Sequence, residues 1–84
     1  MASLDELMAQ LQQVTQHAGE TTTLAAKAGQ TAEQVMGQFQ ALGAAAQVAA
    51  VAQIREGINQ LINSQRGTID LGNQLITRTK AAKG

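Results

Sequence analysis

Apolar side chains recur at alternating steps of three and four residues along the first half of the chain. A repeat that averages 3.5 residues predicts a helix whose apolar stripe packs along another helix in a left-handed, coiled-coil-like seam. The chain of 84 residues contains no proline, so the strongest helix breaker is absent. We therefore predict a helix over about residues 3–42, with this seam: Leu4, Leu7, Leu11, Val14, Ala18, Thr21, Ala25, Ala28, Ala32, Val35, Phe39 and Leu42.

The expected start of this helix carries a capping signal. In Ser3-Leu4-Asp5-Glu6, the Ser3 hydroxyl can accept a hydrogen bond from the backbone N–H of Glu6, whose carboxylate can reach back. Further along, Gly19 and the run 21–23 of three threonines weaken the helix. A break at this point is the alternative to one continuous helix.

A glycine near the midpoint predicts a turn. Gly43 follows the last seam residue of the first helix, where glycine often ends a helix with a positive φ. A single helix running through the alanines that follow is the alternative. The second half predicts a helix over about 45–80, with this seam: Val51, Ile54, Ile58, Leu61, Gln65, Thr68, Gly72 and Leu75. The expected fold is all-α: one domain, residues 1–84, forming an antiparallel two-helix hairpin.

One hairpin of this size encloses a small core, and such chains usually need disulfides, metals or association. Further apolar residues flank both expected seams, which makes the apolar stripes wider than one partner helix requires. These flanking residues are the expected interaction sites: Ile62, Ile69 and Ile76 in the second helix, and Met8, Leu24 and Met36 in the first. We expect self-association, or association with a similar helical protein, into a four-helix bundle or a larger assembly.

Composition argues against several functional classes. No cysteine and a single histidine, His17, leave no basis for a disulfide framework or a metal cluster. Six basic and six acidic residues cancel, which argues against a nucleic-acid-binding surface. We predict no catalytic, metal-binding or cofactor-binding residue and no small-molecule substrate. A membrane-surface helix is a minor alternative, because the polar positions are rich in glutamine rather than lysine.

Two Ala/Gln/Thr/Gly-rich helices of near equal length, a glycine turn and the absence of cysteine resemble the small ESX-type proteins of type VII secretion. That resemblance implies a hairpin that pairs into a four-helix bundle and leaves the bacterial cytoplasm without a cleaved signal peptide. The acidic start around Asp5 and Glu6 likewise predicts no cleaved signal peptide, which would need positive charge there. We therefore expect the protein to be made in the cytoplasm. Its final location is then either outside the cell, after export without a cleaved signal, or in an extracellular assembly. The family's Trp-x-Gly turn motif is replaced by the segment 39–43, Phe-Gln-Ala-Leu-Gly. A subunit of a filament, coat or needle is the alternative interpretation.

Overall fold

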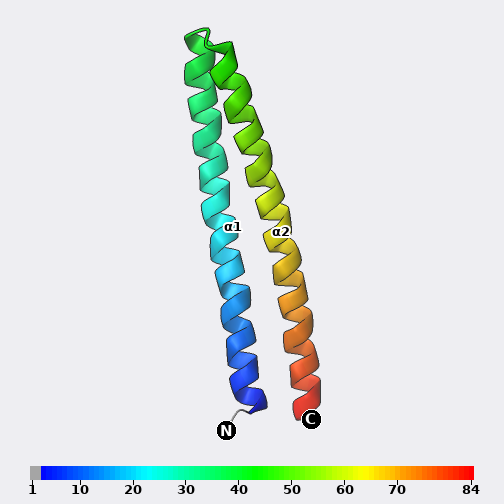
Figure 1. Ribbon diagram of the computed structural model, residues 1–84. Coiled ribbons are helices and arrows are strands. Elements are labelled where there is room, and N and C mark those ends of the chain that lie inside the picture. Colours follow the sequence, from blue (N-terminus) through cyan, green and yellow to red (C-terminus); the bar gives the residue numbers. More distant parts are fainter. Residues whose placement is uncertain (1–2) are drawn as a thin grey trace.

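The computed structural model describes residues 3–84 as two long antiparallel helices that lie side by side (Figure 1). Helix α1 spans Leu4–Ala41 and helix α2 spans Ala45–Lys83. The hairpin measures 62 × 16 × 15 Å, so it is only two helices wide. Met1 and Ala2, with which the expected domain begins, lie outside the described residues.

Local signals in the sequence account for the ends of α1. The Ser3 hydroxyl accepts a hydrogen bond from the Glu6 backbone N–H at 3.2 Å, as the capping signal predicts. At the other end Gly43 has a φ of +71°, which the lack of a Cβ makes inexpensive. The N–H groups of Gly43 and Ala44 bond to the carbonyls of Gln40 and Phe39, a Schellman motif that satisfies two terminal carbonyls.

Helix α1 continues through the segment that was the alternative place for a break. Thr22 donates its hydroxyl to the Ala18 carbonyl at 2.9 Å, and Thr23 donates to the Gly19 carbonyl at 3.2 Å. Each hydroxyl therefore finds its partner within its own helix, one turn back. The β-branched run lowers helix propensity here without interrupting the helix.

Three contacts between the helices define the axial register of the hairpin. The ion pairs Glu33–Arg55 and Asp5–Lys83 join opposite helices. The Ile58 side chain lies against Gly29, where its Cγ2 would be 3.7 Å from an added Cβ. These pairs fix which residues of the two helices lie at the same height along the hairpin. They place Arg78, Lys80 and Lys83, near the end of α2, at the same end of the hairpin as the start of α1.

The predicted seam, however, is wrong in half of its rows. Leu7 and Val14 are 44% and 53% exposed, and Ile54 and Leu61 are 59% and 44% exposed. Thr21, Val35 and Leu75 of the same rows are half-buried. Most of the other buried or half-buried side chains belong either to the remaining predicted row of each helix or to the row one residue after the wrong one. In α1 these are Met8, Leu11, Thr15, Ala18, Thr22, Ala25, Gly29, Ala32, Met36 and Phe39; in α2 they are Val48, Val51, Arg55, Ile58, Ile62, Gln65, Ile69, Gly72, Ile76 and Thr79.

Small residues in α1 opposite isoleucines in α2 explain this rotation. By the register of the Gly29–Ile58 contact, Ala25 lies level with Ile62 and Ala18 with Ile69. A small side chain facing a branched one lets the helix axes approach closely while filling the space between them. Among the described residues, the buried apolar side chains are only Ala18, Ala25 and Ala32.

Candidate interaction face

Heptad notation describes the two sides of the hairpin. Taking Met8 and Ile62 as a positions, the observed seam consists of the a and d positions of both helices. The row preceding each a position is then g, and the row following each d position is e. A groove lined by Ala28 and Val35 of α1 and Ile54 of α2, all g positions, shows that the two g rows share one side.

The e rows share the opposite side. A second groove there is lined by Ala26 and Glu33 of α1 and by Asn59 of α2, all at e positions, together with Arg55. Glu33 and Arg55 approach each other to 3.7 Å across this groove. We call the side with the e rows the polar face and the side with the g rows and the adjoining d rows the apolar face.

Large exposed apolar side chains gather on the apolar face. Among the described residues there are eight of them: Leu4, Leu7, Val14, Leu24, Leu42, Ile54, Leu61 and Leu71. Six occupy d or g positions, and Leu24 and Leu71 occupy the c position that adjoins g on a helix surface. None of these eight side chains lies on the polar face.

Charge is distributed in the opposite way. The chain has twelve charged side chains, and none of them occupies a d or g position. The polar members of the apolar face are neutral: Thr21, Gln47, Gln65, Thr68 and Thr79. An apolar, charge-free surface that runs along both helices has the composition of a helix-packing interface rather than of a solvated surface.

The surface area of the hairpin agrees with an uncovered face. The solvent-accessible area is 5962 Å², about 1,200 Å² more than the roughly 4,700 Å² expected for a compact monomer of this mass. An ordinary protein interface buries about 800 Å² on each partner. The excess is therefore large enough to supply one such interface.

The predicted interaction residues fall into two groups. Ile62, Ile69 and Ile76 are half-buried at a positions of the seam between the helices, and Met8 and Met36 are half-buried at a positions of α1. Leu24, in contrast, is 65% exposed beside the apolar face. That these residues contact a partner stays a prediction, but five of the eight large exposed apolar side chains belong to the g rows, which the sequence prediction had placed inside the hairpin.

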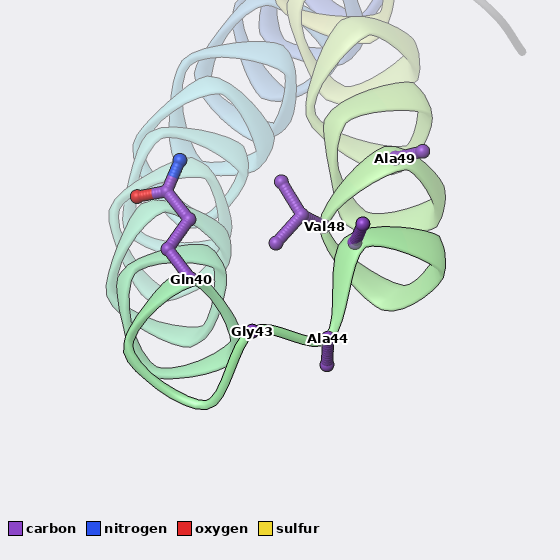
Figure 2. Close-up of a pocket in the computed structure, with 6 residues that line it drawn as sticks. Gln40, Gly43, Ala44, Val48 and Ala49 are labelled. Atoms are coloured by element: carbon purple, nitrogen blue, oxygen red, sulfur yellow. The ribbon is translucent and has the colours of Figure 1, made fainter.

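A small hollow lies beside the turn (Figure 2). It is lined by Gln40, Gly43, Ala44, Ala45, Val48 and Ala49, and Val48 projects toward α1. Its lining contains no ionisable group, and half of the residues that line it are alanines. The hollow is a consequence of small residues next to a short turn, and we assign it no ligand.

The single imidazole belongs to a c position beside the apolar face, in the same row as Leu24. His17 is 79% exposed, and its Nδ1 lies 3.5 Å from the Glu20 carboxylate one turn further along α1. Over residues 3–84, no three histidine, cysteine, aspartate or glutamate residues are grouped so that they could hold a metal ion. Within the same residues, neither helix contains a stretch apolar enough to cross a membrane.

Comparison of the chain with models of known protein families, with curated proteins and with solved structures found no match.

Proposed function

We propose that this protein is a non-enzymatic helical assembly protein that associates with itself through the apolar face. The observation that carries the proposal is the separation of side chains around the hairpin: large exposed apolar groups lie on one side and all twelve charges lie off its d and g rows. Covering that side with a second hairpin would create a four-helix bundle. The architectural resemblance to ESX-type proteins is compatible with this role but supplies no functional residue.

The sparse interior of the hairpin supports the need for a partner. No large side chain among the described residues is fully buried, and the buried apolar groups are three alanines. Alanine side chains bury little area, so the two helices alone gain little hydrophobic stabilisation. Association would bury the leucine, isoleucine and valine side chains that the single hairpin leaves in water.

Replacing Ile54 and Leu61 by glutamine tests the proposal. Both are largely exposed in the hairpin, at 59% and 44%, so the substitutions leave its interior almost untouched. Covering each side chain is worth about 1 kcal/mol. Two such side chains from each of two copies amount to about 4 kcal/mol, or a roughly thousand-fold weaker association.

The measurement is sedimentation equilibrium over a range of protein concentrations, with circular dichroism to report helix content. We expect the unmodified chain to exceed the mass of one chain and the Ile54→Gln/Leu61→Gln variant to approach it. The matched control introduces two glutamines on the polar face, Ala26→Gln and Asn59→Gln, and should leave the mass unchanged. A single-chain mass for the unmodified protein, or an unchanged mass for the variant, would contradict the proposal.

A further inference from the structure

Given the self-association proposed above, the layout of the faces decides what kind of assembly results. An open polymer needs two different complementary surfaces on each subunit, whereas a closed pair needs one self-complementary surface. The hairpin offers one apolar face, and its other side carries Glu33, Arg55 and Arg66 at or beside the polar groove. A second hairpin that covers the apolar face therefore leaves both polar faces outward.

The side-chain sizes along the g row of α1 follow the same order from either end of the helix. Its members, in order, are Leu7, Val14, Thr21, Ala28, Val35 and Leu42. Large residues occupy both ends, and two small ones occupy the centre. A row of this kind fits against a reversed copy of itself, with Leu7 on Leu42, Val14 on Val35 and Thr21 on Ala28 of the second copy.

Two exposed apolar residues of α2 meet about the same centre. By the contacts Gly29–Ile58 and Thr15–Gly72, the level midway between Thr21 and Ala28 of α1 corresponds to the level between Ile62 and Asn63 of α2. A two-fold axis at that level sets Ile54 of one copy level with Leu71 of the other, and both side chains are more than half exposed. The same rotation brings Leu61 level with the smaller Ser64.

Two of the most exposed leucines also gain partners in the reversed arrangement. Leu42, which is 78% exposed, would be covered by Leu7 of the second copy. Leu24, which is 65% exposed, lies at the level of the axis and meets its own copy at the rim of the interface. With both copies pointing the same way, Leu42 would instead lie level with Ala45, a small residue beside the turn.

We infer that the protein forms a closed, antiparallel pair of hairpins, in which the turn of each copy lies beside the termini of the other. The two-fold axis crosses α1 between Thr21 and Ala28. The partner of the apolar face is thus a second copy of this chain, and the assembly contains two chains rather than a growing filament.

A distance between two spin labels tests this arrangement in the full chain. The chain has no cysteine, so Ala41→Cys introduces one attachment site per copy, at an exposed position at the end of α1. In the antiparallel pair the two labels are separated along the bundle axis by the length of 33 helical residues, which is about 50 Å at about 1.5 Å per residue. With both turns at one end, only the width of the bundle separates the labels, roughly 20–25 Å. A label at Lys27→Cys lies close to the axis and should give a short distance in either arrangement, which makes it the control.

Each outcome of sedimentation and of the distance measurement has a definite meaning. A two-chain mass with a label distance near 50 Å at position 41 supports the antiparallel pair. A two-chain mass with a short distance overturns the antiparallel orientation and leaves the proposed function standing. A mass that grows beyond two chains overturns the closed pair, and a single-chain mass at all concentrations overturns the proposed function as well. Circular dichroism of each labelled variant confirms that the helices are intact.

Discussion

Gly72 provides the sharpest test of the observed seam, because of all the glycines it leaves the least room for an added Cβ. A Cβ added at Gly72 would overlap the hydroxyl oxygen of Thr15 and lie 3.4 Å from the Thr15 Cβ. The Thr15 hydroxyl is held by a 2.9 Å hydrogen bond to the Leu11 carbonyl, so relieving the overlap breaks that bond or moves the helices apart. Gly67→Ala is the control, since no atom lies within 4 Å of a Cβ added there.

The expected effects follow from two opposing contributions. Replacing a helical glycine by alanine stabilises a helix by about 0.5–1 kcal/mol where space is free. Overpacking a close contact costs about 1–3 kcal/mol. We therefore expect Gly67→Ala to stabilise the hairpin, and we expect Gly72→Ala to be less stable than Gly67→Ala by about 1–3 kcal/mol.

Thermal unfolding followed by circular dichroism, at one fixed protein concentration, measures this difference. For a domain of this size, 1 kcal/mol corresponds to a Tm shift of roughly 4–8 °C. Thr15→Ala removes the atoms that collide most closely, so the cost of Gly72→Ala should fall markedly in that background. Equal stabilisation by Gly72→Ala and Gly67→Ala, with no coupling to Thr15→Ala, would refute the close contact and with it the assigned seam.

Three further predictions concern the ends of the helices. Ser3→Ala removes the acceptor for the Glu6 N–H and should destabilise the hairpin by about 1 kcal/mol, whereas Ser3→Asp should retain stability; urea unfolding monitored by circular dichroism distinguishes them. Gly43→Ala forces a Cβ into a left-handed conformation with φ +71° and should cost about 1–2 kcal/mol in the same assay; an unchanged midpoint would contradict that turn geometry. Asp5→Asn removes an exposed ion pair with Lys83 and should change stability by at most about 1 kcal/mol; high salt should reduce this small difference further, and a larger loss would show that the pair is shielded from water.

Periodicity and local signals predicted the helices and the turn. The Ser3 cap and the positive φ of Gly43 depend on residues within a few positions of each other, and the pattern in the sequence specifies them directly. The position of the turn fixes which residues of the two helices lie level, and the Lys83–Asp5 ion pair shows that the open end of the hairpin follows from it. These features need no knowledge of how the helices are rotated.

Rotation about the helix axis was the part that periodicity left undetermined. The d row of α1 belongs to two stripes with the same three-and-four spacing, one shared with Leu7 and Val14 and one shared with Met8 and Thr15. The predicted stripe includes Leu7 and Val14, but in the structure small groups of α1 oppose isoleucines of α2 and the stripe with Met8 and Thr15 lies in the seam. The apolar face was not predicted, because its g rows were expected inside the hairpin.

The short turn at Gly43 has a consequence for the order in which the hairpin closes. Paired residues near the turn are only a few positions apart in the chain, whereas Asp5 and Lys83 at the far end are separated by 78 positions. Once the turn has formed, each further layer extends a loop that is already nearly closed, so the entropy cost of each step stays local. We therefore expect the helices to zip from the turn toward the termini. Amide hydrogen exchange should accordingly be slowest near the turn and fastest at the open end, apart from the frayed last residues of each helix.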